Sequence, residues 1–560
     1  MGAWCKGDII DASSCRNAFV DEASLSINAG WILNKLQPWF VGCVLMAAAT
    51  AAQAAIFTVT NTGDNGGINP AIAAGTGTLR QAIIDSGAAS GANEIHFNIP
   101  GTGPFTITIT PAKQLPAINA GHNLTSLIID GYSQPGSLFN TRSPDEGALN
   151  AHLQIEIVGD GNMPGFYYDC CAAVNKLTLT LQGVAMHGFW YALSGQNATL
   201  TPKAKLIVYG SYLGTKIDGT ALAALGNSSA AIIAGYDDAQ VGGTESSQRN
   251  LLSGNLIGFS GGTANASIVV EGNLIGTDLT GTVAIPNTQA GVVLYGNFPG
   301  VRVGCTGSGC NSDASRNVIS GNHTYGVGIQ GTSVGGMQLK GNYIGTDYTG
   351  TKPLPNGDDV ISCPNFCGGI QMSGPTTAQP ATVIGGFNPG EANLIAYNHG
   401  PGIVAAFDRL GENFDNQGNA IYRNYSTDVA FYALGREPND AGDADTGANK
   451  HQNFPVIQSA SVVGSNLNVT YAVDTAVAAA AYPLRIDFYV PVAHGGGRFL
   501  VSDSYPSASA QVPRAVSLPL PIDALPLVGI VATATSAEGF SSEYSLDVVF
   551  DRVFADAFGP

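Results

Sequence analysis

Charged residues are scarce in this chain, and basic residues are the scarcest. Asp, Glu, Lys and Arg make up 11% of the 560 residues, with 23 Lys and Arg against 41 Asp and Glu and a formal net charge of −18. An acidic chain without a cluster of Lys and Arg repels both the phosphate backbone of nucleic acids and anionic lipid headgroups. We therefore expect no nucleic-acid partner.

Long stretches with helical periodicity are also lacking. Gly accounts for 73 residues, and a Gly inside a helix costs about 1 kcal/mol relative to Ala. The chain is too long for one growing hydrophobic core, yet its apolar content is 44%. These features predict a β-rich protein with many tight turns, built from several domains or as one elongated solenoid.

One apolar segment, residues 39–54, precedes the β-rich part and ends in Ala-Gln-Ala, the small-x-small pattern of a signal-peptide cleavage site. A buried helix is the alternative, but the chain continues at once with the strand-like FTVTNTGD. We predict that residues 1–54 are a leader and signal peptide and that the mature chain begins near Ala55 without a transmembrane segment. The protein is then secreted, extracellular or on the outer cell surface.

Two phrases recur along the chain. The longer one occurs as GSYLGTKIDGTALAALGN from Gly210, GNLIGTDLTGTVAIPN from Gly272 and GNYIGTDYTGTKPLPN from Gly341. The shorter one occurs as RNLLSGN from Arg249, RNVISGN from Arg316 and ANLIAYN from Ala392. Such internal self-similarity is the signature of a solenoid, in which each repeat stacks on its neighbours.

Within these units, Gly-Asn pairs recur every 18 to 25 residues, which is the length of one coil. Short apolar runs such as SIVVEGN at 267–273 lie between them and are typical of strands. Asn tolerates the left-handed conformation of turns, and stacked Asn side chains can hydrogen-bond the next coil. We predict a right-handed parallel β-helix in which the Asn residues, and the recurring Arg249 and Arg316, are structural.

The open ends of a solenoid need cover, because an exposed coil is an unpaired sheet edge. Near the N-terminus, Thr78 and Gln81 form a capping-box pair, and Leu79 and Ile83 share one helical face. We predict a short amphipathic helix that lies over the first coil.

After Asn453 the repeat stops and apolar residues alternate with polar ones, from Leu467 to Val473 and from Leu484 to Val490. The predicted fold is therefore all-β: a right-handed parallel β-helix solenoid followed by a small immunoglobulin-like β-sandwich. The predicted segments are the leader and signal peptide at 1–54, an N-terminal cap and first coils at 55–135, the β-helix at 136–438, an acidic linker at 439–452, the β-sandwich at 453–550 and a C-terminal tail at 551–560.

These phrases carry a family resemblance. Together with GTGTLRQAIIDS from Gly75 and IIDGYSQPG from Ile128, they resemble the bacterial right-handed parallel β-helix repeat proteins with a CSLREA-type N-terminal segment. The resemblance covers most of residues 56–550 and departs at the namesake motif, which is matched here by GTLRQA at 77–82. It implies a secreted or surface-exposed protein and supplies no catalytic residues.

Six cysteines follow the predicted leader: Cys170, Cys171, Cys305, Cys310, Cys363 and Cys367. An even number of cysteines in an exported chain favours disulfides. A zinc site made of the last four is the alternative, but the CxxxxC and CxxxC spacings are poor matches to zinc ribbons. We predict disulfides within this set and leave the pairing open.

Parallel β-helices often degrade acidic polysaccharides, so a pair of carboxylates is a candidate catalytic site. Asp358 and Asp359 in NGDDVISC are similar to the paired aspartates of polygalacturonases. The accompanying motifs of those enzymes are only partly present, since His399 lies in NHG and Arg485 is followed by Ile-Asp in the other domain. The alternative for the two aspartates is a solvated turn, which we favour.

A candidate metal site lies in NDAGDADTGAN at 439–449, where Asp440, Asp443, Asp445 and Asn449 place hard oxygens at close spacing. Ca²⁺ prefers such ligands, although the distal Glu of an EF-hand is missing. The competing interpretation is a solvated acidic linker.

Two classes of function follow. The first is a secreted or cell-surface scaffold, without enzymatic activity, that contacts a cell-surface or matrix polysaccharide or a neighbouring cell surface, requires no cofactor and has Ca²⁺ as an optional ligand. The second is a polysaccharide lyase or glycoside hydrolase that acts on acidic polysaccharide. We favour the first, because the coils are regular and a full catalytic set is missing from the motifs.

Overall fold

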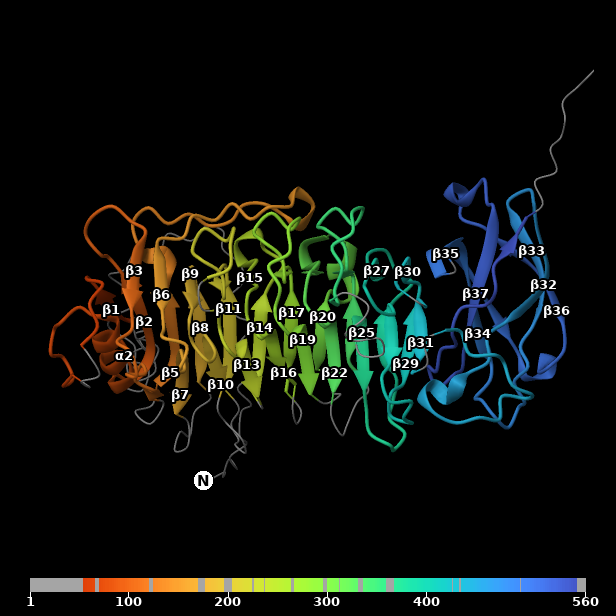
Figure 1. Ribbon diagram of the computed structural model, residues 1–560, viewed down its shortest axis with the longest axis horizontal. Coiled ribbons are helices and arrows are strands. Elements are labelled where there is room, and N and C mark those ends of the chain that lie inside the picture. The colour runs from red at the N-terminus through yellow and green to blue at the C-terminus, as the bar shows by residue number, and fades with distance from the viewer. Residues whose placement is uncertain are drawn as a thin grey trace, which may run out of the picture. The chain divides into compact units, whose positions relative to one another are not determined.

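The structure is a computed structural model that describes residues 54–550, apart from 66–69, 120–123, 170–176, 196–203, 224–225, 236, 263–265, 296–299, 312, 331–335, 359–366, 426, 433–434 and 494. The predicted leader at 1–54 and the predicted tail at 551–560 therefore lie almost wholly outside the described residues. Three sheets of parallel strands run along the molecule (Figure 1). This is the predicted parallel β-helix.

Sheet A holds eleven described strands. In spatial order they are β1 (Ala55–Val59), β2 (Gly91–Phe97), β5 (Leu124–Asp130), β8 (Thr178–Gln182), β11 (Lys205–Tyr209), β14 (Asp238–Gly242), β17 (Ile268–Glu271), β20 (Val301–Gly304), β23 (Gln338–Lys340), β26 (Thr382–Gly385) and β29 (Phe414–Gln417).

Sheet B begins with ten parallel strands, most of them short. They are β3 (Phe105–Thr108), β6 (Ile155–Val158), β9 (Val184–His187), β12 (Tyr212–Leu213), β15 (Leu251–Leu252), β18 (Leu274–Ile275), β21 (Val318–Ile319), β24 (Tyr343–Ile344), β27 (Leu394–Ala396) and β30 (Ala420–Tyr422).

Sheet C forms the third side of the coils. Its described strands are β4 (Ile118–Asn119), β7 (Phe166–Asp169), β10 (Leu193–Gly195), β13 (Ala230–Gly235), β16 (Ile257–Gly261), β19 (Ala290–Tyr295), β22 (Tyr325–Gln330), β25 (Gly368–Ser373), β28 (Ile403–Ala405) and β31 (Val429–Phe431).

The core is a set of columns in which equivalent residues of successive coils stack. In sheet B the inward column is fully buried and almost entirely aliphatic: Ile157, Met186, Leu213, Leu252, Ile275, Ile319, Ile344, Ile395 and Ile421. Because side chains alternate between the two faces of a strand, the neighbouring residues point outward. Removing these columns from water is the main favourable contribution to folding.

The glycine that recurs in the long phrase is required by the close stacking of coils. Gly276 and Gly345 have φ of +90° and +94°, and a Cβ at either position would collide with the backbone carbonyl of Ser320 or Ala396 in the next coil. Only Gly adopts this conformation at low cost while letting two backbones approach so closely.

Buried Asn side chains form two continuous ladders along the solenoid. In the first, each side-chain amide donates to the side-chain oxygen of the next, at 2.9–3.0 Å, in the order Asn250, Asn273, Asn317, Asn342, Asn393 and Asn419. In the second, the same bond measures 2.8–3.1 Å, in the order Asn227, Asn255, Asn287, Asn322, Asn356, Asn398 and Asn424. The structural role predicted for these residues is confirmed.

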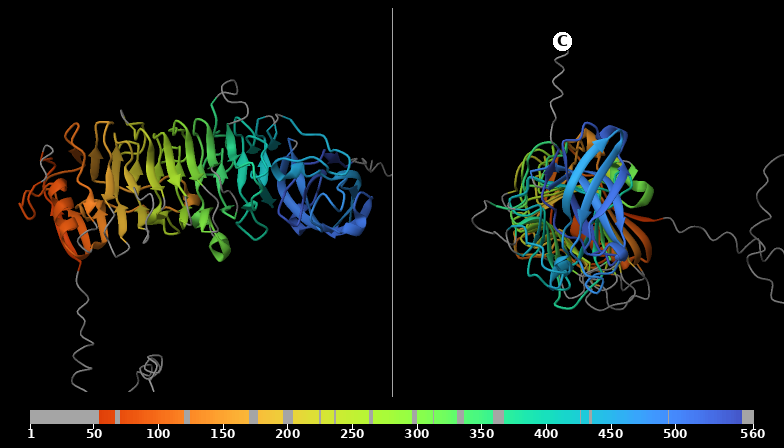
Figure 2. Two further views of the ribbon diagram at one scale, coloured as in Figure 1. Left: turned by 90° about the horizontal axis from the view of Figure 1, so that it is seen from below. Right: turned by 90° about the vertical axis from the view of Figure 1, so that its right-hand side faces the viewer.

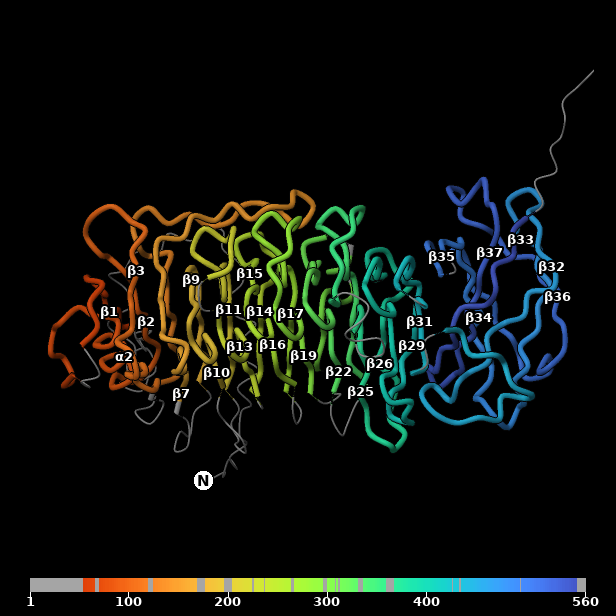
Figure 3. The backbone as a smooth tube through the Cα atoms, in the orientation of Figure 1, coloured from red at the N-terminus to blue at the C-terminus, as the bar shows by residue number. Residues whose placement is uncertain are grey.

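A long segment between β5 and β6, residues 131–154, extends along the outside of sheet B over later coils, and we call it the strap (Figure 3). Buried Arg249 holds it, because its Nη1 donates to the backbone oxygens of Arg142, Ser143 and Gly147 at 2.9–3.1 Å. Near the tip, Asp145 forms an ion pair with Arg316 at 2.7 Å. The recurring arginines thus have structural roles, as predicted.

The N-terminal end of the solenoid is covered by helix α2 (Leu79–Ala88) (Figure 1). Thr78 is its N-cap and accepts a hydrogen bond from the backbone N–H of Gln81. Leu79 and Ile83 are buried in the solenoid core. The predicted helix is therefore confirmed.

The C-terminal module consists of two antiparallel sheets. One contains β32 (Val456–Val463), β33 (Asn466–Ala472) and β36 (Arg514–Pro519), and the other contains β34 (Leu484–Val492), β35 (Gly495–Tyr505), β37 (Gly529–Thr535) and β38 (Val548–Val549). Their shared core includes Leu467, Val469, Tyr471, Val473, Leu484, Ile486 and Phe488, the residues whose alternation predicted these strands.

The module also closes the C-terminal end of the solenoid (Figure 2). Strand β35 pairs antiparallel with β30, so sheet B continues into the module. Tyr489, Val531 and Tyr544 of the module belong to the core cluster of the solenoid. In the described part of the chain, no helix has the length and apolar character needed to cross a membrane.

Candidate functional site

The outer face of sheet B changes character along the solenoid. From β9 to β21 its outward column consists of Ala185, Tyr212, Leu251, Leu274 and Val318, which are buried beneath Leu149 and Leu153 of the strap. Because the strap ends near Arg316 and Tyr348, it covers only this part of the column.

Beyond the strap, three tyrosines lie on the uncovered end of the same face. Tyr343 continues the outward column, Tyr397 follows β27, and Tyr422 ends β30. All three are partly exposed. The rings of Tyr397 and Tyr422 meet edge to face, with centroids 6.0 Å apart. We call Tyr343, Tyr397, Tyr422 and the adjacent Arg423 the tyrosine face.

Two arginines complete the surface of this face. The guanidinium of Arg423 is exposed, lies 5.9 Å from the ring centroid of Tyr397 and donates to its hydroxyl at 3.3 Å. The guanidinium of Arg316 lies 4.2 Å from the ring centroid of Tyr343. Burial, together with the neighbouring tyrosines, raises the pKa of Tyr422 despite Arg423. The face therefore presents neutral, amphipathic rings and fixed hydrogen-bond donors.

The predicted Ca²⁺ ligands are only partly brought together. One carboxylate oxygen from each of Asp440, Asp443 and Asp445 lies within 4.8 Å of the others. Asn449 is committed elsewhere, because its side chain accepts from the N–H of Phe414 and donates to the carbonyl of Ser541, at 2.7 and 2.6 Å. The structure thus assigns Asn449 to the closure of the solenoid and the three aspartates to one acidic cluster.

Asp443 is the buried member of this cluster and is extensively hydrogen-bonded. Its carboxylate accepts from the backbone N–H of Asn453 at 2.9 Å, the side-chain amide of Gln452 at 2.7 Å and the hydroxyl of Thr475 at 2.9 Å. Burial raises its pKa to about 6, although these hydrogen bonds act in the opposite direction. Segment 439–452 is therefore fastened to the module at Asp443.

A histidine lies beside the same cluster. His451 Nε2 is 2.5 Å from Asp408 and its Nδ1 is 2.9 Å from Glu437 and 3.7 Å from Asp445. Burial lowers the pKa of His451, but the hydrogen bond to Asp408 and the charges of all three carboxylates outweigh burial and raise it. The raised pKa favours the protonated form of His451, whose positive charge beside the acidic cluster opposes the binding of a metal ion there.

The structure describes only one of the two candidate catalytic aspartates. Asp359 lies outside the described residues, whereas Asp358 is exposed on a turn, 3.5 Å from His323. His399 lies on the next coil, with its Nδ1 3.1 Å from the carbonyl oxygen of Gly357. Arg485, weighed with this pair in the sequence, lies on β34 of the C-terminal module and forms ion pairs with Asp415 of β29 and Asp487 of β34.

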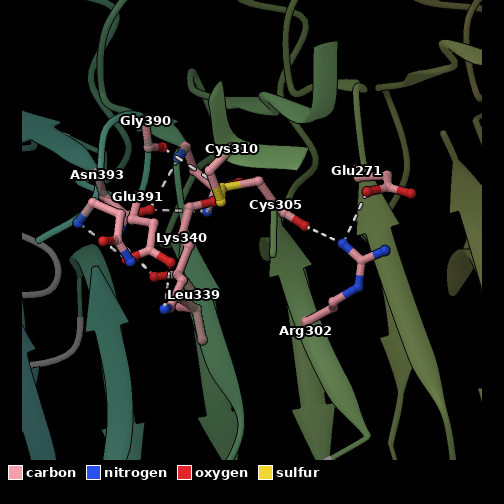
Figure 4. The surroundings of a disulfide bond; sticks show 12 residues. Glu271, Arg302, Cys305, Cys310, Leu339, Lys340, Gly390, Glu391 and Asn393 are labelled. Carbon is pink, nitrogen blue, oxygen red and sulfur yellow. Dashed lines mark hydrogen bonds and ion pairs between the residues drawn. A yellow bond between two sulfur atoms is a disulfide. The ribbon is translucent and has the colours of Figure 1, made fainter. Parts of the chain in front are cut away.

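Three of the six predicted disulfide cysteines, Cys305, Cys310 and Cys367, lie in described segments between strands of the solenoid. Cys305 and Cys310 form a disulfide that follows β20, between the ion pairs Arg302–Glu271 and Lys340–Glu391 (Figure 4). Cys367 is also disulfide-bonded, so these three sulfurs are not zinc ligands. The remaining candidates, Cys170, Cys171 and Cys363, lie outside the described residues.

Sequence reasoning missed the tyrosine face, although a signal was present. The signal is Tyr397, which lies inside ANLIAYN at a position where the other copies of the short phrase carry Gly. Tyr343 gives no such signal, because the copy from Gly210 carries Tyr212 at the same position and that ring is buried beneath the strap.

No protein-family model matches this chain, and no curated protein matches it.

Proposed function

We propose that this chain is a secreted or cell-surface β-helix scaffold that binds polysaccharide on its tyrosine face and does not transform it. The observation that carries the proposal is a set of partly exposed rings beyond the end of the strap. Tyr343 belongs to the outward column of sheet B, and Tyr397, Tyr422 and the exposed Arg423 lie on the next two coils. Tyr side chains offer an apolar ring and a polar tip at low entropic cost, which suits a wet, extended ligand.

The scaffold supports this role through its stiffness. Stacked coils with buried amide ladders hold the three rings at fixed spacing, so that little conformational entropy is lost on binding. The net charge of −18 opposes strongly acidic polymers at long range. We therefore expect the best ligands to be neutral or weakly acidic polysaccharides of a cell surface or matrix.

The proposed place of action is outside the cell, and it rests on the apolar segment and cleavage pattern at 39–54. We also propose kinship with the bacterial β-helix repeat proteins that carry a CSLREA-type segment. The supporting residues are those of GTLRQA at 77–82, since Thr78 caps helix α2 and Arg80 forms a buried ion pair with Asp64 at 2.6 Å.

The test is affinity electrophoresis of the purified chain from Ala55 in gels that contain dextran, xyloglucan, pectin or alginate. Replacing both rings, Tyr397→Ala with Tyr422→Ala, should weaken retardation by a neutral polymer about tenfold, equivalent to about 1.4 kcal/mol. The matched control is Tyr295→Ala, which removes an exposed tyrosine from sheet C and should change nothing.

The same preparation separates a scaffold from an enzyme. Release of reducing ends or unsaturated products, abolished by Asp358→Asn with Asp359→Asn, would replace this proposal by a polysaccharide hydrolase or lyase. Equal retardation of the parent and the double tyrosine variant would remove the tyrosine face from the proposal.

A further inference from the structure

A cavity of 350 Å³ lies at the junction between the last coil and the C-terminal module. The coil contributes Thr427 and Asp428, the connecting segment contributes Arg436, and the module contributes Glu543, Tyr544 and Leu546. The volume is within the roughly 300–1,000 Å³ of small-molecule sites. None of these residues belongs to the tyrosine face.

Glu543 is the first sign that the cavity receives a ligand. Its side chain is 3% exposed, and its Oε2 accepts from the backbone N–H of Glu437 at 2.7 Å. Its Oε1 is buried and has no hydrogen-bond partner. An unsatisfied buried polar atom of this kind costs stability, so a ligand hydroxyl that hydrogen-bonds Oε1 recovers stabilisation that the folded chain lacks.

Asp428 is the second carboxyl group, and it is held rigidly. It ends the second Asn ladder, because its Oδ1 accepts from the side-chain amide of Asn424 at 2.8 Å and from the backbone N–H of Asn424 at 3.2 Å. The side chain is 7% exposed. A row of amides that all donate toward Asp428 fixes this carboxyl group at the wall of the cavity.

The remaining walls supply donors and apolar surface. Arg436 is close enough to lower the pKa of both Asp428 and Glu543 through its charge, although burial raises these pKa values to about 7 and about 8. The hydroxyl oxygen of Thr427 is buried and unpartnered, and Leu546 adds an exposed apolar side chain. The cavity thus combines acceptors, donors and carbon surface within one monosaccharide-sized space.

We infer that this cavity binds a single neutral sugar residue, at the end or on a branch of a glycan. Sugar hydroxyls both donate and accept, so one ring can satisfy Glu543, Asp428 and Arg436 together. An anion would face two carboxyl groups, and a metal cation would face Arg436. This site is independent of the tyrosine face, and either can fail without the other.

The experiment is saturation-transfer NMR on the purified chain from Ala55 with neutral methyl glycosides of glucose, galactose, mannose and N-acetylglucosamine. We expect saturable binding of at least one glycoside, weakened about tenfold by Glu543→Met and by Thr427→Val, since each removes a hydrogen-bonding group. The matched control Glu538→Gln alters an exposed glutamate that pairs with Lys450 and should leave the affinity unchanged.

Three results decide the inference. No saturable signal with any glycoside overturns it, and so does equal affinity in the parent, Glu543→Met and Thr427→Val proteins. Displacement of the glycoside by millimolar Ca²⁺ overturns it in favour of a cation site. Retention of glycoside binding in the double tyrosine variant that no longer binds polysaccharide supports it and separates the two sites.

Discussion

The solenoid and its C-terminal closure bury polar groups in different ways. Along the solenoid, neutral amides form two continuous buried ladders, and in the second each Asn donates to the Asn of the next coil at 2.8–3.1 Å. At the closure the buried groups include carboxyl groups, among them Glu412, Asp428, Asp443 and Glu543, whose pKa values burial raises to between about 6 and about 8.

This difference shows how a ladder of Asn side chains can be terminated at the last coil. An amide is both donor and acceptor, so a ladder satisfies itself coil after coil at no electrostatic cost. Its last member needs an acceptor that no further coil supplies, and Asp428 provides that acceptor for Asn424. Buried carboxyl groups are costly unless they are well paired, and four of those whose pKa burial raises, Glu412, Asp428, Asp443 and Glu543, lie at or near the closure, so we expect the closure to respond to pH.

Breaking a ladder should have the largest effect. Asn322→Ala removes the side chain that accepts from Asn287 and donates to Asn356 and to the carbonyl of Ile275. Leaving these buried groups unpaired should lower the free energy of unfolding by about 3–5 kcal/mol, measured by urea denaturation. The control Asn162→Ala, at an exposed turn, should cost less than about 1 kcal/mol, and equal losses would refute the structural weight of the ladder.

The closure should weaken as the pH rises, whereas the ladders should not. Burial raises the pKa of Glu543 from 4.5 to about 8. The negative charge of Glu437 also raises this pKa, whereas the charges of Arg436 and His451 lower it. The folded state therefore holds the proton more tightly, and its stabilisation is complete below pH 4.5 and is lost as the pH passes through about 8. We expect the local opening free energy of β37 to fall by roughly 3 kcal/mol between pH 5 and pH 9.

Hydrogen exchange measures this difference directly. After correction for the intrinsic exchange rate, amides of β37 should lose protection over that range while amides of β19 and β22 keep theirs. In Glu543→Gln most of the pH dependence of β37 should disappear. Parallel loss of protection in both regions would show that the closure is not the titrating element.

Releasing the strap should expose the covered part of sheet B with a somewhat smaller effect. Arg249→Met removes three hydrogen bonds from Nη1 to the strap backbone and should cost about 2–3 kcal/mol. The strap, residues 131–154, should then be cleaved by trypsin many times faster than in the parent protein. Arg142→Lys is the control, since that side chain is exposed and the substitution keeps the single trypsin site of the strap, and unchanged cleavage in Arg249→Met would contradict the anchoring role.

Calcium should give the smallest effect, confined to the closure. At 10 mM Ca²⁺ a site with the affinity of extracellular modules, about 10⁻⁴–10⁻³ M, adds roughly 1.4–2.7 kcal/mol. We expect a rise of a few degrees in the melting temperature, abolished by Asp445→Asn and not reproduced by Mg²⁺. An unchanged melting temperature would show that the three aspartates do not bind Ca²⁺ and serve only to hold segment 439–452 against the module.

The periodic features could be predicted from sequence because each depends on local chemistry that repeats. Gly276 and Gly345 mark the points where coils touch, and Asn317 and Asn322 mark the ladders. The alternation from Leu467 to Val473 predicted strand β33 for the same reason, because successive side chains of a strand point to opposite faces and every second one is buried.

Contacts between distant segments were decided only by the tertiary structure. The sequence does not show that the strap stops short of Tyr343, that Asn449 serves the end coil, or that Asp428 and Glu543, 115 residues apart in the printed numbering, share a cavity. Local patterns encode which face of a strand is buried, but they do not encode which remote segment buries it. The repeat and its ladders were therefore determined by the sequence itself, whereas both candidate binding sites arise where the repeat loses its cover or comes to its end.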